Sequence, residues 1–133
     1  MSQNNIISNR GAKFHFKIEK GTYFPLAFYA ADENGPMNLT GFAGARLTLR
    51  ASESETATVL KAMTGTISAP SAGNDAGFEL YYKVAFAFAA ADTDKTAFTN
   101  TSGFIKAELL DTASRPVPLA YADTDLFPEV DQQ

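Results

Sequence analysis

The chain has 133 residues, no cysteine, no tryptophan and a single histidine. Its length suits one domain with its own core, and its composition excludes disulfides, thiolate or multi-histidine metal sites and a cysteine nucleophile. The formal net charge of −4 argues against a nucleic-acid binder, which needs a surplus of Lys and Arg for phosphate contacts. We expect a protein that is not an enzyme and holds no cofactor.

The two ends of the chain carry opposite charge. Residues 1–20 hold four basic residues against one glutamate, a net of +3, and residues 111–133 hold five acidic residues against one arginine, a net of −4. This asymmetry favours head-to-tail contacts between neighbours over self-complementary ones.

Neither a signal peptide nor a membrane helix is visible in the sequence. The first residues lack a basic start, and the longest apolar run, residues 84–91, has eight residues, whereas a membrane helix needs about 20. We expect a chain that neither spans a membrane nor is exported by itself.

The predicted elements begin with a polar arm over residues 1–12, in which Ile6 and Ile7 form an isolated apolar pair. No period of two or of 3.6 residues runs through this segment. Two interpretations stay open, namely a disordered terminus and an arm that docks on a neighbour.

Two strands follow the arm. Apolar and polar residues alternate strictly over residues 13–19, which predicts a half-buried strand. Residues 23–30 form the next strand, in which Leu26 and Phe28 face inward and Pro25 indicates an edge or a bulge. A dense turn signal over residues 32–36 ends it.

The middle of the chain alternates in the same way. Residues 43–51 form a strand that exposes Arg46 and Arg50. The next predicted elements are a short strand over residues 59–63, a connection over 64–77 and a strand over 78–84 with Tyr81 facing outward. Phe86 and Phe88 then share one face, either as core or as an exposed ridge that docks a partner.

The last third holds one helical turn within residues 89–98 and two closing strands. The strand over residues 103–111 has two registers, which bury either Ile105, Ala107 and Leu109 or Phe104 and Leu110. The final strand covers residues 117–122. About seven short strands with few helical segments favour an all-β, antiparallel β-sandwich. We place this domain at residues 13–130, before a tail end of residues 131–133.

Three stretches together resemble a known family. They are Asn38-Leu39-Thr40-Gly41 opening a strand that ends at Arg46–Arg50, a strand led by Gly77 that runs into Ala91-Asp92-Thr93, and a closing strand pair ended by Pro128-Glu129-Val130. This order is similar to the small immunoglobulin-like β-sandwich of tailed-bacteriophage virion proteins, including the N-terminal domain of the upper baseplate protein family. The resemblance covers residues 14–130 and implies an immunoglobulin-like fold without catalytic residues.

The resemblance implies a structural role in a virion assembled in the host cytoplasm. The expected partners are other virion proteins of the tail, baseplate or fibre-attachment region, with the chain oligomeric in the particle. Capsid decoration is the first alternative, because small sandwich proteins with arms also clamp capsid subunits. A carbohydrate-binding module for host glycans is the second. The residues expected to contact partners are Ile6, Ile7, Arg10, Lys13, Arg46, Arg50, Tyr81 and Phe127.

Two Asp-Thr-Asp sequences are weak candidates for a metal site. Residues two apart in an extended segment project to the same side, so Asp92 with Asp94, and Asp123 with Asp125, could each offer two carboxylates to calcium. Structural capping is the alternative, because Asp and Thr also cap helices and turns.

Aromatic and histidine side chains complete the candidates. A sugar-binding face would need at least two of Tyr23, Tyr29, Tyr81 and Tyr82 side by side in the open. Ordinary surface or interface positions are the alternative for each of them. His15 faces outward by alternation and is either an ordinary surface histidine or a protonation-dependent contact.

Overall fold

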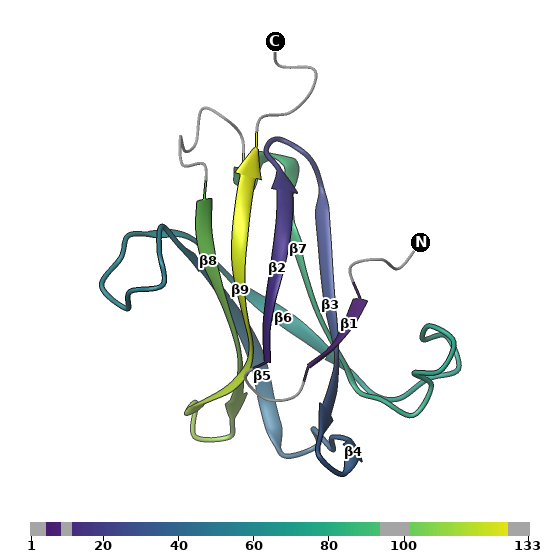
Figure 1. Cartoon of the computed structure of the whole chain (residues 1–133). Coiled ribbons are helices and arrows are strands. Elements are labelled where there is room, and N and C mark those ends of the chain that lie inside the picture. The colour runs from purple at the N-terminus through teal and green to yellow at the C-terminus, as the bar shows by residue number, and fades with distance from the viewer. Residues whose placement is uncertain (1–4, 9–11, 94–101, 128–133) are drawn as a thin grey trace.

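The computed structural model describes residues 5–8, 12–93 and 102–127, and this part of the chain is all-β (Figure 1). Its one helical element is a short 3₁₀ turn, η1 (Ala90–Thr93). The strands are β1 (Asn5–Ser8), β2 (Ala12–Glu19), β3 (Phe24–Asp32), β4 (Gly35–Pro36), β5 (Phe42–Arg50), β6 (Val59–Ser68), β7 (Lys83–Phe88), β8 (Ser102–Asp111) and β9 (Pro116–Phe127). Among the described residues no helix has the length and apolar character needed to cross a bilayer.

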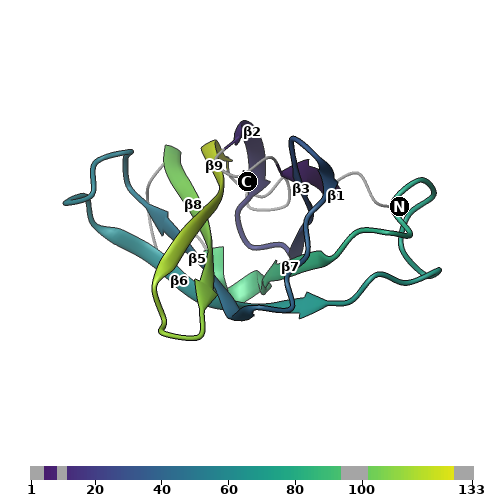
Figure 2. The same cartoon turned by 90° about the horizontal axis from the view of Figure 1, so that it is seen from below.

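The strands form one curled sheet in the order β1-β3-β7-β6-β5-β8-β9-β2, with β4 paired to β3. Two of the pairings, β1 with β3 and β2 with β9, are parallel, so the sheet is mixed rather than antiparallel throughout. The curl brings β2 beside β3 (Figures 1 and 2), although they occupy distant places in the strand order. The rings of Phe14 and Phe16 lie 6.3 and 6.5 Å from that of Phe28. Aromatic contacts therefore join the two halves of the sheet, β1-β3-β7 and β5-β8-β9-β2, on this side.

Strand β6 joins the two halves on the other side, because it changes partner along its length. Its pairing with β5 reaches Gly65, opposite Ala45, and its pairing with β7 begins at Thr66, opposite Ala85. A Cβ atom added at Gly65 would lie 2.5 Å from the Phe86 ring. Only glycine fits this approach without displacing its neighbours.

The core confirms most of the predicted alternation. Leu26 and Phe28 are buried, as are Ala45, Leu47 and Leu49 of β5. Strand β8 takes the first of its two registers, with Ile105, Ala107 and Leu109 buried. Phe86 and Phe88 are 4% and 0% exposed and pack in the same core, so they are not a docking ridge. Pro25 lies beyond the end of the β1–β3 pairing, which starts at Ala27, in agreement with an edge position.

Three predicted segments differ from the structure. Residues 78–82 form turns instead of a strand, because the Asn74 side chain donates to the carbonyls of Phe78 and Tyr81 and the Phe78 ring stacks on Tyr29 at 4.6 Å. Residues 64–68 are strand, not connection, since β6 continues to pair with β7. Within the predicted arm, residues 5–8 form β1, whose backbone pairs with Ala27–Ala30.

Candidate functional site

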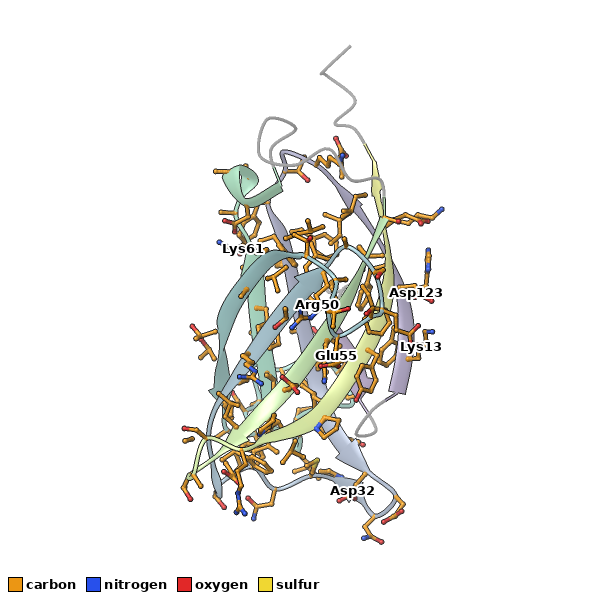
Figure 3. The ribbon with its side chains drawn as sticks, turned by 90° about the vertical axis from the view of Figure 1, so that its left-hand side faces the viewer. Lys13, Asp32, Arg50, Glu55, Lys61 and Asp123 are labelled. Carbon is orange, nitrogen blue, oxygen red and sulfur yellow. The ribbon has the colours of Figure 1, made fainter. Side chains whose placement is uncertain are left out.

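The outer face of strands β5, β8, β9 and β2 carries a group of charged side chains. On these strands the residues that alternate with the core point away from it. Figure 3 shows Arg50, Glu55, Asp123 and Lys13 together on this side. We call this surface the charged face, and it consists of Lys13, His15, Arg46, Arg50, Lys106, Glu108, Asp123 and Asp125.

Glu108 is the most buried charge on the charged face, with 7% of its side chain exposed. Its carboxylate accepts from Arg46 Nε at 2.8 Å and lies 3.5 Å from Lys106 Nζ. Lys106 in turn donates to Glu55 at 3.1 Å. This hydrogen bond raises the pKa of Lys106 and lowers the pKa of Glu55. The two cations compensate a carboxylate that would be costly to bury alone.

Strands β2 and β9 contribute a second set of charge pairs. Lys13 Nζ lies 3.5 Å from Asp123 and 3.7 Å from Glu53, and His15 Nε2 lies 3.0 Å from Asp125. All these side chains are more than half exposed, so solvent screens the pairs and each is weak. The parallel register places Lys13 opposite Tyr121 and thereby brings these partners together.

An aromatic hollow lies in the charged face. Phe104 is on the outward side of β8, yet it is only 7% exposed. Its ring stacks on Tyr121 with centroids 6.1 Å apart, and Lys13 Nζ lies 5.7 Å from its centroid. The hollow has a volume of about 350 Å³, and its lining consists of Lys13, Arg50, Glu53, Glu55, Phe104, Lys106 and Tyr121. A neighbouring hollow of about 310 Å³ shares Arg50, Glu55 and Lys106 with it.

The loop of residues 51–58, between β5 and β6, forms one wall of the aromatic hollow. Arg50 Nη1 donates to the carbonyl of Ala57 at 3.0 Å, and the backbone N–H of Ala51 donates to Thr58 at 2.8 Å. These bonds fix the base of the loop. Its two glutamates, Glu53 and Glu55, remain 70% and 76% exposed at the side chain.

Of the residues predicted to contact partners, the structure brings three together. Lys13, Arg46 and Arg50 all lie on the charged face, where each has an intramolecular partner. Tyr81 lies elsewhere, half-buried against Phe78 and Tyr29. The backbones of Ile6 and Ile7 belong to β1, Phe127 ends β9, and Arg10 lies outside the described residues.

Sequence reasoning missed two parts of the aromatic hollow, namely the Phe104 ring and the wall formed by the loop of residues 51–58. The sequence allowed two registers for β8, and Phe104 faced the core in only one of them. Nothing in the local pattern distinguished a residue buried in the core from an outward residue covered by a distant loop. The available signal was a large aromatic in phase with Lys106 and Glu108, which are charged and point outward.

The Asp-Thr-Asp sequences have other partners in the structure. Asp92 accepts from Lys61 Nζ at 2.9 Å and from the backbone N–H of Ala89 at 2.7 Å, which agrees with a structural capping role. Asp123 pairs with Lys13 and Asp125 with His15, and Asp94 lies outside the described residues. Within residues 5–8, 12–93 and 102–127, no group of three acidic or histidine side chains comes together as a metal site.

The tyrosines do not form the open pair that a sugar platform needs. Tyr29 is fully buried and lies against Tyr81, which is therefore partly covered. Tyr82 packs against the core, and Tyr23 alone of the four is largely exposed, at 66%. The described aromatic side chains thus favour packing roles.

In comparisons with known proteins, neither a family model nor a curated protein matches the sequence. The site must therefore be interpreted from its own geometry.

Proposed function

We propose that the chain is a non-enzymatic structural protein of a bacteriophage virion, which docks onto neighbouring proteins in the tail, baseplate or fibre-attachment region. The observation that carries the proposal is the edge strand β1. It stands at one end of the strand order and pairs only with β3 among the described residues, whereas β2, at the other end, lies beside β3. An edge strand offers backbone N–H and C=O groups that can add a strand from another chain.

The proposed fold is an immunoglobulin-like sandwich, and the strand order supports it. The order β1-β3-β7-β6 follows A-B-E-D, and β5-β8-β9 follows C-F-G. Two features depart from that pattern. Strand β1 runs parallel to β3, and β6 pairs with β5 as well as with β7. The second departure joins the two halves into one curled sheet.

The charged face supports docking as well. It alternates cations and carboxylates over several strands, which suits a polar contact with a neighbour whose charges are complementary. Interfaces of this kind fix orientation and register more than they add affinity.

The test is whether a variant that lacks residues 1–8 is incorporated into virus particles. This deletion removes β1 and leaves β2 intact. We expect the purified variant to keep a β-rich circular dichroism spectrum and to be lost from particles, because the edge of the sheet has changed. Glu33→Gln, in the exposed turn between β3 and β4, is the matched control and should be incorporated normally. Normal incorporation of the truncated chain would exclude docking through β1. Electron microscopy of labelled particles distinguishes tail from capsid, and absence from both would overturn the proposed role.

A further inference from the structure

The tip of the loop of residues 51–58 is closed on itself. The backbone N–H groups of Thr56 and Ala57 donate to the hydroxyl and carbonyl oxygens of Ser54, at 3.2 and 3.0 Å. At the base of the loop, the backbone N–H of Ala51 donates across to the other strand of the loop at 2.8 Å. The tip can therefore move about this base as one unit and keep its internal hydrogen bonds.

Two ion pairs join this tip to the sheet across the aromatic hollow. Glu53 lies 3.7 Å from Lys13 Nζ on β2, and Glu55 lies 3.1 Å from Lys106 Nζ on β8. Within the described part of the chain, no further ion pair or hydrogen bond connects residues 52–56 with a strand. Both carboxylates are largely exposed, so each pair is weak and sensitive to salt.

Release of the tip costs little, because both lysines have a second carboxylate on the sheet. Lys13 Nζ lies 3.5 Å from Asp123, and Lys106 Nζ lies 3.5 Å from Glu108. Neither ammonium group loses its last partner when the loop moves away. The released glutamates pass fully into water, where a carboxylate needs no protein partner.

The aromatic rings of the hollow lie behind these pairs. Phe104 points outward from β8, yet it is only 7% exposed, and Lys13 Nζ lies 5.7 Å from its ring centroid. Glu53 is one of the two carboxylates that hold this ammonium group in place. Movement of the tip removes one wall of the hollow and loosens Lys13. Phe104 and the Tyr121 ring stacked on it then become accessible.

We propose that the loop of residues 51–58 is a strap, which the pairs Glu53–Lys13 and Glu55–Lys106 hold across the aromatic hollow and which opens as ionic strength rises. The Debye length falls from about 30 Å at 0.01 M salt to about 3 Å at 1 M, so added salt weakens both pairs. Opening converts a charged surface into an accessible aromatic one. The strap is a property of the isolated chain and is independent of the proposed virion role.

The first experiment measures the accessibility of Phe104 in the full-length, isotope-labelled chain by NMR. A neutral gadolinium chelate in the solvent speeds the relaxation of exposed protons. We expect its effect on the Phe104 ring protons to rise by about twofold or more between about 0.02 M and about 1 M NaCl, because salt releases the strap. The amides of Leu47 and Leu49, which lie in the core, are the internal reference and should not change.

Neutral loop variants assign this response to the two ion pairs. In E53Q/E55Q we expect the ratio of open to closed strap to rise by about threefold to tenfold at low salt, with no further rise at high salt. E33Q, in the exposed turn between β3 and β4, is the matched control and should respond like the wild-type chain. A wild-type chain without a salt response, or a salt response that persists in E53Q/E55Q, would overturn the proposal.

A spin label on the loop tests the movement itself. Because the chain has no cysteine, S52C at an exposed position provides a single attachment site. Broadening of the Lys106 and Tyr121 amides by this label should weaken from low to high salt, and it should be weak at both in S52C/E53Q/E55Q. Unchanged broadening while Phe104 becomes accessible would mean that movement of Lys13 alone uncovers the ring, and it would exclude a moving strap.

Discussion

At the scale of single residues, Gly65 is the position least able to change. It lies where β6 leaves β5 for β7, and an added Cβ would meet the Phe86 ring at 2.5 Å and the carbonyl oxygen of Ala85 at 3.0 Å. We predict that Gly65→Ala lowers the free energy of unfolding by about 1–3 kcal/mol through overpacking. Urea denaturation measures this. Gly44→Ala, whose Cβ would meet nothing within 4 Å, should lower it little or raise it.

Asp92 is a residue whose charge stabilises the fold in a pH-dependent way. The hydrogen bond from Lys61 is the main cause that lowers the pKa of Asp92 in the folded state. The stabilisation is thus complete above the ordinary aspartate pKa of about 4 and is lost as pH falls through the lower folded value. Asp92→Asn should cost about 0.5–1 kcal/mol at pH 7 and almost nothing near pH 2. A cost that stays constant across urea melts at these pH values would contradict this assignment.

At the scale of elements, β1 stabilises one edge of β3. Its four residues pair with Ala27–Ala30, which are all buried. We predict that deletion of residues 1–8 leaves cooperative unfolding intact but speeds hydrogen exchange at the β3 amides that face β1, by about tenfold or more. The amides of Leu47 and Leu49 in β5, on the far side of the sheet, serve as internal controls. Unchanged exchange along β3 would mean that β1 contributes no protection.

Sequence alone predicted the elements whose side chains alternate between core and solvent. Strands β2 and β5 have this pattern, and Leu47 and Leu49 of β5 were assigned correctly to the inward face. In β3, which is buried on both faces from Leu26 to Ala31, the inward direction of Leu26 and Phe28 was also correct. The pattern fails where burial is not periodic. In residues 78–82 alternating aromatics mimic a strand, but their packing on Tyr29 and the hydrogen bonds of Asn74 hold them in turns.

The candidate site was predictable only in part for a related reason. The outward direction of Arg46 and Arg50 follows from local alternation, but their partners do not. Arg46 meets Glu108, which is 62 residues away in the sequence, and Lys13 meets Asp123 through the parallel pairing of β2 with β9. Parallel pairing between distant segments leaves no local signal, and the aromatic hollow depends on it.

At the scale of the whole molecule, the described acidic residues of the two Asp-Thr-Asp sequences already have basic partners within the chain. The carboxylates of Asp92, Asp123 and Asp125 each lie within 3.5 Å of a basic side chain. A calcium ion would have to displace these side chains and find further oxygens. We predict that EDTA leaves the midpoint of thermal unfolding unchanged. A fall of several degrees would indicate a metal ion that stabilises the folded state.

The parallel pairing of β2 with β9 also determines how the molecule bears mechanical load. Ala12, at the start of β2, pairs with Ala120, and Glu19, at its end, pairs with Phe127 (Figure 1). Tension between Ala12 and Phe127 therefore pulls the two strands past each other in opposite directions. Every hydrogen bond of the ladder shares the force at once, instead of opening one after another as in a zipper. We expect high resistance to stretching along this axis in single-molecule pulling, and much less between Ala12 and Ala120, where the same ladder opens from one end.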